Sequence, residues 1–196
     1  MLYIPGDEIK EKIKMHPTAT RLENGKIYAN VIGMVSDNVF KPFELAYVAN
    51  VGDLIVGVVY EKKPNVIFVD TSTSYTGLVM AKAIRIEIKQ GDIISGKVSK
   101  IEESDIILSD ISLLSSRNEI GTLISIPPSK VARIIGKDAT MISLIKEKTS
   151  CKIVVGMNGY IWIQGKNAEK AVKAILFIIK RAHLQGLTSK VEQILA

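Results

Sequence analysis

The chain has 196 residues, of which 47% are hydrophobic and 23% charged, and it contains a single cysteine. This composition allows a buried core and excludes intrinsic disorder, while one thiol excludes both an internal disulfide and a cysteine-based zinc site. The net charge is +6, but residues 116–196 carry 13 basic against 5 acidic residues, a local surplus of +8. Such a surplus attracts polyanions such as nucleic acid, although a solvated lysine-rich surface explains it equally well.

Short strands are expected at the start of the chain, within a region rich in turn-forming residues. Strand patterns occur in GKIYANVIGMV at 25–35 and around FELAYV at 43–48. The opening YIPGDEI turns polar too soon for a secretory signal, and the longest apolar run, AILFII at 174–179, is too short to cross a bilayer. These features predict a small β domain over residues 1–50, in a cytoplasmic protein with no membrane partner.

Residues 51–115 are predicted to form a second β domain of several short strands. GDLIVGVVYE at 52–61 and NVIFVDTS at 65–72 are rich in β-branched residues and are bounded by turn signals. The phrase G-D-x-I-x-G-x-V occurs twice, starting at 52 and at 91, as expected if two strands of one barrel start alike. Five short strands in about 60 residues match an OB-type barrel, a fold that often holds nucleic acid on one face.

Residues 116–196 follow a different, mixed pattern. A short helix at 130–136, a glycine turn and a second helix that begins after Ala139 are expected first. Two strands at 152–156 and 160–165, joined by an Asn-Gly hairpin, and a long helix at 168–185 follow. This order is that of a KH domain, which clamps about four nucleotides of RNA backbone with a GxxG loop between its first two helices.

The loop in the GxxG position is Gly136-Lys137-Asp138-Ala139. Glycine allows the backbone to approach a phosphate, and the N–H groups that open the following helix favour negative charge. The side chain of Lys137 adds positive charge, as do Lys130 and Arg133 on the preceding helix. We therefore predict RNA contacts from Lys130, Arg133, Gly136 and Lys137, beside an apolar groove lined by Ile134 and Ile135.

This loop departs from the GxxG pattern in two ways. Ala139 replaces the second glycine, which costs roughly 1 kcal/mol if the position needs a positive φ. Asp138 adds a negative charge that repels phosphate. Direct RNA contact and a structural role are therefore both open for this loop. The second glycine turn, with Gly156, Asn158 and Gly159, is interpreted as a structural hairpin, and a binding turn is its alternative.

Four motifs together resemble the S-one/KH cap subunit of the archaeal RNA exosome. YIPGDEI is similar to that family's N-terminal strand, GKIYANVIGMV to its N-terminal barrel, and VGDLIVGVV to the start of its S-one type OB domain. GMNGYIWI is similar to the GxNG turn and aromatic strand of its KH domain. The implied fold is multidomain, mainly β plus α+β: an N-terminal β domain (1–50), an OB-fold β-barrel of the S-one type (51–115) and a C-terminal KH domain (116–196).

The resemblance implies a non-catalytic subunit without a cofactor or a metal. Three copies, as a homotrimer or a mixed trimer, would sit on a hexameric phosphorolytic ring and recruit single-stranded RNA for 3′-to-5′ degradation. Tyr3, Ile4 and Pro5 would dock on the ring, because they offer an apolar strand with an exposed edge. The alternative is a free-standing RNA-binding protein of translation or ribosome assembly, for which the N-terminal segment has no obvious use.

The predicted barrel supplies further candidates for RNA contacts: Lys62, Lys63, Asn65, Tyr75, Lys82 and Arg85. The first three lie in a loop between strands, and Tyr75 lies in a polar loop where its ring could stack on a base, which is worth about 1–3 kcal/mol. Phe68 could also stack, but it alternates with Val66 and a place in the core explains it as well. Related barrels carry a stacking histidine near the position of Met80.

An enzyme is not indicated. His16 and His183 are far apart in the sequence and have no partner motif, and the chain contains no H-E-x-x-H, P-loop or G-x-S-x-G pattern. Trp162 follows the hairpin at strand alternation and is predicted to be packed in the core.

Overall fold

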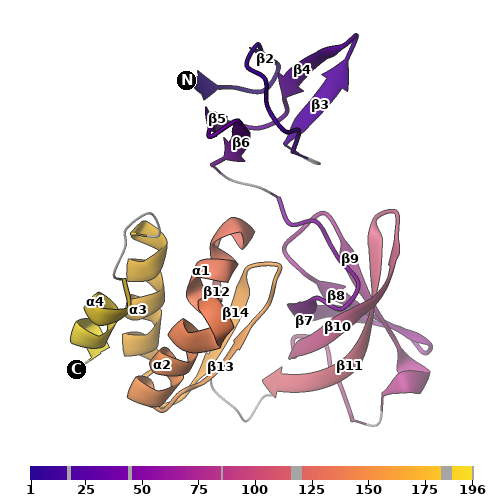
Figure 1. Ribbon diagram of the computed structural model, residues 1–196. Coiled ribbons are helices and arrows are strands. Elements are labelled where there is room, and N and C mark those ends of the chain that lie inside the picture. The colour runs from indigo at the N-terminus through magenta and orange to yellow at the C-terminus, as the bar shows by residue number, and fades with distance from the viewer. Residues whose placement is uncertain (17–18, 44–45, 85, 116–120, 182–186, 196) are drawn as a thin grey trace. The chain divides into compact units, whose positions relative to one another are not determined.

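The computed structural model describes residues 1–196 apart from 17–18, 44–45, 85, 116–120, 182–186 and 196 (Figure 1). The described residues form two compact units, Met1–Ala46 and Tyr47–Ala196, each with a core of its own. No helix in the described part of the chain is long and apolar enough to span a membrane.

The first unit consists of two small antiparallel sheets around one apolar core. One sheet has the order β1-β5-β6 and the other the order β2-β4-β3. Their bounds are Leu2–Tyr3 (β1), Glu8–Ile9 (β2), Thr20–Glu23 (β3), Lys26–Ala29 (β4), Gly33–Ser36 (β5) and Val39–Pro42 (β6). Tyr3, Ile9 and Phe40 provide the large side chains of the core. The single strand pattern at 25–35 is therefore divided between β4 and β5.

The second unit begins with a closed five-stranded barrel of order β10-β11-β9-β8-β7. The strands are β7 (Leu54–Lys62), β8 (Val66–Asp70), β9 (Thr76–Met80), β10 (Ile93–Glu102) and β11 (Asp105–Ser115), and a short 3-10 helix at Ala81–Ala83 follows β9. The strand expected around 43–48 is wrong over its described C-terminal part, because Tyr47 extends into the barrel core instead of joining a sheet. Residues 44–45 lie outside the described part.

The repeated phrase G-D-x-I-x-G-x-V has a structural reason. Its two copies start β7 and β10, which pair antiparallel with each other, so that Gly57 lies opposite Ile94 and Gly96 opposite Ile55. The N–H of Val59 donates to the carbonyl of Asp92 at 2.9 Å, and the N–H of Val98 donates to that of Asp53 at 2.9 Å. The final valine of each copy therefore donates a hydrogen bond to the backbone of the aspartate in the other copy. This confirms that two strands of one barrel start alike.

The glycine and aspartate of each copy form a turn of one type, and the first unit contains a third example. In each turn the aspartate accepts a hydrogen bond from the backbone N–H three residues earlier: Ile4 to Asp7 at 2.9 Å, Asn50 to Asp53 at 3.1 Å and Lys89 to Asp92 at 2.8 Å. The intervening glycines have φ values of 97°, 95° and 90°, which other residues rarely adopt. The G-D dipeptide of the opening YIPGDEI is therefore a turn signal.

The rest of the second unit has the strand and helix order of a KH domain. A three-stranded antiparallel sheet of order β12-β14-β13 carries helices on one face. The elements are β12 (Thr122–Ser125), α1 (Val131–Ile135), α2 (Thr140–Thr149), β13 (Lys152–Val155), β14 (Tyr160–Gln164), α3 (Ala168–Lys180) and α4 (Leu187–Leu195), with 3-10 turns at Pro128–Lys130 and Lys137–Ala139. The long helix expected over 168–185 ends at Lys180, and residues 182–186 lie outside the described part.

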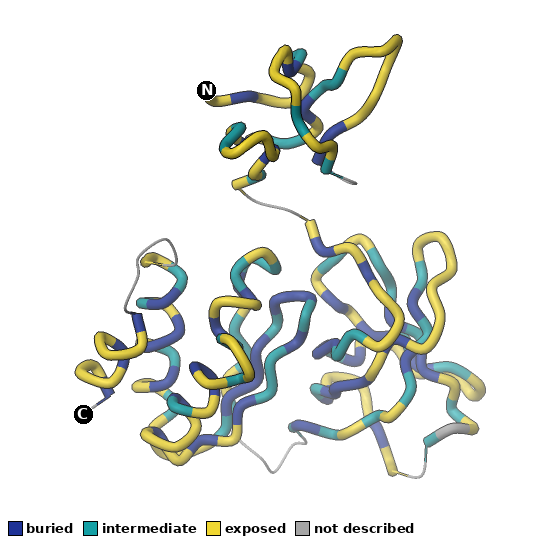
Figure 2. Tube along the Cα trace, viewed as in Figure 1, coloured by how far each residue is buried: buried dark blue, intermediate teal, exposed yellow. Residues whose placement is uncertain are grey.

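The strand β14 lies between the helical layer and the barrel and is buried on both faces (Figures 1 and 2). Ile161 and Ile163 pack into the core beneath the helices, whereas Trp162 packs with Val56 of β7 and Leu114 of β11. Trp162 is 1% exposed, as predicted for a core residue. A side chain at Gly121 would place its Cβ 2.1 Å from this indole, so the tryptophan also fills the space that this glycine leaves.

Candidate nucleic-acid interface

The outer face of β8 carries an aromatic platform. Ile67 and Val69 point into the barrel core, so Phe68 points outward and is half-buried. The core interpretation of Phe68 is therefore wrong. Its ring centroid lies 6.0 Å from that of Tyr60 on β7, and the Nζ atom of Lys63 lies 4.8 Å from the Phe68 centroid. Two neighbouring aromatic rings tilted by 49°, with a cation over one of them, form a surface on which bases of single-stranded RNA can stack.

Tyr60 was not among the residues selected from the sequence. The sequence of β7, LIVGVVYEK, is apolar up to Val59, and a register shift between Val59 and Glu61 turns the Tyr60 ring outward. As a result Tyr60 is 45% exposed. The signal that could have identified it is the single aromatic residue where an apolar run changes to the charged Glu61-Lys62-Lys63.

Four of the predicted barrel contacts gather at one end of this platform. The N–H of Ala81 donates to the Asn65 carbonyl at 3.0 Å, which brings Lys82 close to the turn that contains Lys63 and Asn65. Lys62 does not lie in this turn, as the sequence suggested, but is the last residue of β7. The roles of Lys62 and Lys63 differ, because the Nζ atom of Lys62 donates to the carbonyl of Ile88 at 3.0 Å. Lys62 therefore binds the segment between β9 and β10. The Lys63 amine lies over the Phe68 ring and 3.4 Å from the carboxylate of Glu61. Arg85 lies outside the described residues.

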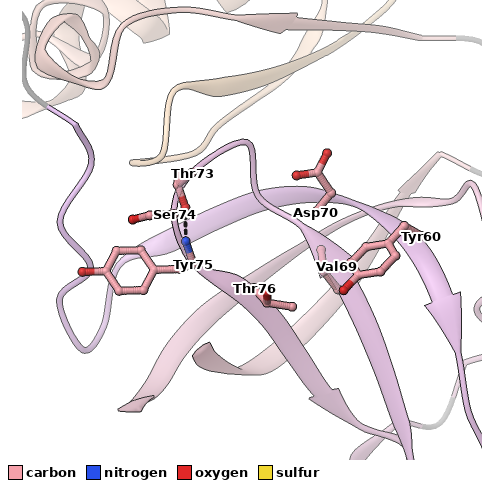
Figure 3. Close-up of a pocket in the computed structure, with 7 residues that line it drawn as sticks. All are labelled: Tyr60, Val69, Asp70, Thr73, Ser74, Tyr75 and Thr76. Atoms are coloured by element: carbon pink, nitrogen blue, oxygen red, sulfur yellow. Dashed lines mark hydrogen bonds between the residues drawn. The ribbon is translucent and has the colours of Figure 1, made fainter. Parts of the chain in front are cut away.

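Tyr75 lies at the opposite end of β8, away from these lysines. It lines a surface pocket of about 350 Å³ together with Tyr60, Val69, Asp70, Thr73, Ser74 and Thr76 (Figure 3). The Tyr75 ring packs edge-on against Tyr47, with centroids 6.3 Å apart. Tyr47 in turn donates a 2.6 Å hydrogen bond to Asp53, and burial together with this carboxylate raises the pKa of Tyr47. The contact with Tyr47 therefore fixes the Tyr75 ring, which points away from Asp70 and Tyr60 (Figure 3).

The GKDA loop has a positive φ at three of its four positions. Gly136 has φ 76°, Asp138 has φ 51° and Ala139 has φ 60°. The expectation that Ala139 needs a positive φ is thus confirmed, and Asp138 shares the strain. The α2 helix starts directly afterwards at Thr140, whose hydroxyl donates to the carbonyl of Lys137 at 2.8 Å. The side chains of Lys137 and Asp138 are both exposed, so a positive and a negative charge compete at this loop.

An apolar groove runs beside this loop, but its lining differs from the prediction. Ile134 is completely buried in the helical core and cannot contact a base. The reason is that Ile134 and Ile135 are adjacent on a five-residue helix, so only one of them can face outward. The groove has a volume of about 290 Å³ and is lined by Ile135, Ile142, Ile153, Val154, Val155, Lys146 and the barrel residue Leu54. Lys130 is half-buried and Arg133 is exposed on the same short helical segment.

The turn with Gly156, Asn158 and Gly159 enters the barrel. Asn158 is 4% exposed, and its Oδ1 atom accepts from the N–H of Val56 at 3.2 Å. Its Nδ2 atom donates to the carbonyls of Val56 at 2.7 Å and of Thr71 at 2.8 Å. A side chain at Gly159, which has φ 92°, would place its Cβ 2.2 Å from the Ile126 carbonyl. This turn therefore clamps the sheet of β12–β14 onto the barrel.

The docking prediction for Tyr3, Ile4 and Pro5 needs correction at Tyr3. Tyr3 is 5% exposed, because its ring packs against Phe40 and its hydroxyl donates to Glu11 at 3.1 Å. It belongs to the core of the first unit and is not an exposed docking residue. Ile4 is 53% exposed, and Pro5 is exposed as well. The strand β1 lies at the edge of its sheet, as the prediction requires.

An apolar face adjoins this edge on the outer side of the β1-β5-β6 sheet. Leu2 lies opposite Met34, and Ile4 and Ile32 lie just beyond the strand ends, next to the pair of Tyr3 and Gly33. The N–H of Phe43 donates to the Ile32 carbonyl at 3.0 Å, which places Phe43 beside this pair. All five side chains are exposed. We refer to Leu2, Ile4, Ile32, Met34 and Phe43 as the apolar face; contiguous apolar surface of this kind typically marks a protein–protein contact.

A double substitution at the GKDA loop tests whether the loop contacts RNA. Asp138→Gly with Ala139→Gly is expected to tighten RNA binding about fivefold, because it removes a charge that repels a nearby phosphate, an effect of about 1 kcal/mol. The measurement is a fluorescence anisotropy titration with single-stranded RNA. The single variant Ala139→Gly is the matched control, since it relieves backbone strain but keeps the charge. Unchanged affinity in the double variant would show that this loop does not face RNA.

Among the described residues, no group of three or more His, Cys, Asp or Glu side chains is arranged to hold a metal ion.

Comparison with known proteins gives matches over the KH region and over nearly the whole chain. A family model described as a KH domain matches residues 121–169. A relative from Thermococcus kodakarensis, "Exosome complex component Rrp4", is 33% identical over 99% of this chain and 84% of its own length. Relatives with the same name from Picrophilus torridus and Methanobrevibacter smithii are 34% and 32% identical, over 96% and 97% of this chain and 89% and 69% of theirs.

A solved structure supports the same grouping. It is described as a candidate exosome complex RNA-binding protein, and it matches with a TM-score of 0.67 and 26% identity over 77% of this chain and 95% of that chain. Together with the KH match and the closed barrel, this confirms the predicted fold class, mainly β plus α+β with a barrel and a KH domain.

Proposed function

Because the chain belongs to the Rrp4 family of exosome complex components, we propose that it is the non-catalytic, RNA-binding cap subunit of an archaeal exosome. In this role it recruits single-stranded RNA and delivers it to a ring that degrades RNA from the 3′ end by phosphorolysis. The observation that carries the proposal is the match to Rrp4 relatives over nearly the full chain. The exposed aromatic platform with adjacent lysines supports it from the structure.

The barrel offers separate places for bases and phosphates along β8. The rings of Tyr60 and Phe68 stack bases without regard to sequence, since every base has an aromatic face. Lys63 and Lys82, at the end marked by Asn65, attract the phosphates of the same strand. An RNA strand with its phosphates at the basic end and its bases on the rings would run along the outer face of β8.

The KH region provides a second contact. The groove beside α1 and α2 is apolar apart from Lys146, and the exposed Arg133 and Lys137 each lie two residues from its lining residue Ile135. Apolar side chains suit base faces, and the lysine and arginine side chains suit the backbone between them. Leu54, the first residue of β7, also lines this groove, so the barrel contributes to the KH contact at the end of β7 that lies away from Tyr60.

We place the contact with the ring on the first unit, at the apolar face and the edge of β1. The first unit exposes these five apolar side chains on or beside one sheet, and none of them belongs to its core. Three copies, identical or mixed with a second kind of cap subunit, would surround the entrance of the ring. The free thiol of the buried Cys151 agrees with a cytoplasmic location, where thiols stay reduced.

Salt dependence tests the electrostatic part of RNA binding. In anisotropy titrations at several salt concentrations, the logarithm of the affinity should fall with a slope of about −0.7 per phosphate contacted. The double variant Lys63→Ala, Lys82→Ala should make the slope shallower by about 0.7 for each phosphate that it no longer binds. Lys173→Ala on α3, where Lys173 pairs with Glu169 at 2.7 Å, is the matched control and should leave the slope unchanged. Affinity without any salt dependence would contradict RNA binding by these surfaces.

A further inference from the structure

The pocket at the end of β8 contains a carboxylate that the binding of RNA phosphates does not explain. Asp70 is exposed and lines the pocket, with the Tyr60 ring on one side and the Thr73–Thr76 segment on the other (Figure 3). A negative charge at this point repels the RNA backbone. Such a charge can still favour RNA binding when it faces a hydrogen-bond donor of a base.

One hydrogen bond within the protein orients the carboxylate of Asp70 and leaves its other acceptor positions available. Its Oδ1 atom accepts a hydrogen bond from the N–H of Ser72 at 2.8 Å, which fixes the plane of the group. A carboxylate has about four acceptor positions, so Oδ2 and one lone pair of Oδ1 remain available. Within the described residues no lysine or arginine forms an ion pair with Asp70.

The position of Asp70 suits the edge of a base whose face lies on the aromatic platform. Asp70 and Phe68 are two residues apart and point to the same side of β8, so their Cα atoms are about 7 Å apart along the strand. Cross-strand from Asp70 lies Thr76, which with Ser74 adds hydroxyl groups to the pocket. A base stacked on Tyr60 and Phe68 can therefore present its Watson–Crick edge to this carboxylate.

We propose that Asp70 is a specificity-determining residue that selects bases with hydrogen-bond donors on their Watson–Crick edge, guanine first. Guanine offers two adjacent donors, N1–H and the N2 amino group, which match both oxygens of a carboxylate. Adenine and cytosine each offer one amino group next to an acceptor nitrogen, and uracil offers N3–H between two carbonyl oxygens that a carboxylate repels. The expected order of preference is guanine, then adenine and cytosine, then uracil. This inference rests on the proposed RNA-binding function.

The test uses the full chain and four oligonucleotides. Each is an oligouridylate of about ten nucleotides, within the range that one OB fold covers, with guanosine, adenosine, cytidine or uridine at the central position. The oligonucleotide with guanosine should bind the wild-type chain at least about fivefold more tightly than the one with uridine, as expected for a bidentate base contact. Circular dichroism of each variant checks that the fold is retained.

Asp70→Asn should reduce this preference to about twofold or less, because the amide keeps the acceptor for Ser72 N–H but presents a donor to the base. Asp110→Asn removes the same charge at a residue that pairs with Lys97 at 3.3 Å, and it should keep the full preference. A guanosine preference that is absent in the wild type, or unchanged in Asp70→Asn, overturns the role of Asp70 while RNA binding itself stands. Failure of all four oligonucleotides to bind would instead contradict the proposed function together with this inference.

Discussion

Asn158→Ala is expected to destabilise the second unit by about 3 kcal/mol or more, since each buried backbone group left without a partner costs roughly 1–3 kcal/mol. The substitution removes three hydrogen bonds at once, from the Val56 N–H and to the carbonyls of Val56 and Thr71. These groups lie between the barrel and the KH sheet, where Asn158 is almost completely buried. The partners of Asn158 are 102 and 87 residues away and belong to the barrel region. The substitution should therefore weaken the contact between the barrel and the KH region, and not the hairpin alone.

The single tryptophan of the chain reports on this contact directly. Trp162 packs between the sheet and the barrel with Val56 and Leu114, so its fluorescence should shift to longer wavelength when the contact opens. Urea unfolding of the wild type and of Asn158→Ala, followed by this fluorescence, measures the difference. Asn65→Ala, at an exposed loop asparagine, is the matched control and should change stability by less than about 0.5 kcal/mol. Equal midpoints for all three proteins would refute the clamp assigned to Asn158.

Met34→Glu should weaken binding to the exosome ring by about thirtyfold or more while leaving RNA affinity unchanged. Met34 is exposed in the middle of the apolar face, with Leu2 directly opposite and Ile32 two residues before it. An acidic side chain in place of an apolar one within a protein interface typically costs about 2 kcal/mol or more, and Lys41, which lies opposite Met34 on β6, already pairs with Asp37 at 2.9 Å. Because the substituted side chain points to solvent in the free subunit, its folding should change little. The measurement is surface plasmon resonance of the chain on immobilised ring.

Leu22→Glu is the matched control for this substitution. Leu22 lies in the same unit and is at least as exposed, but it belongs to β3 of the other sheet. The same exchange of an apolar side chain for an acidic one there should leave ring binding intact. If Leu22→Glu weakened binding as much as Met34→Glu, or if neither did, the contact would have to be moved away from the apolar face.

Local sequence patterns predicted the order of elements well because each pattern has a short-range cause. The Asn-Gly pair indicated the hairpin between β13 and β14, and the G-D phrases indicated the strands that follow them. The family resemblance rested on the same motifs and agreed with the relatives found over the whole chain. What these patterns could not give was the partner of Asn158, because bonds across 102 residues leave no local trace.

The errors concern which side of an element faces inward. In β8 all of Val66, Ile67, Phe68 and Val69 are apolar, so alternation could not show that Phe68 points outward. The strand β1 has two residues, which is too short for an alternation that would have identified Tyr3 as a core residue. In α1 the adjacent Ile134 and Ile135 looked equivalent until packing placed one in the core and one in the groove. Tertiary packing decides such cases, and the local sequence does not contain it.

The central claim is that the chain binds RNA for a ring that degrades it and does not cleave RNA itself. The direct test is a decay time course with a 5′-labelled RNA, magnesium and phosphate, in which the chain, the exosome ring of its own organism and their mixture are compared. The chain alone should leave the RNA intact. The mixture should elute as one complex, with three copies per ring by light scattering, and degrade RNA faster than the ring alone, because tethered substrate has a high effective concentration at the entrance. RNA cleavage by the chain alone, or failure to associate with the ring, would contradict the account.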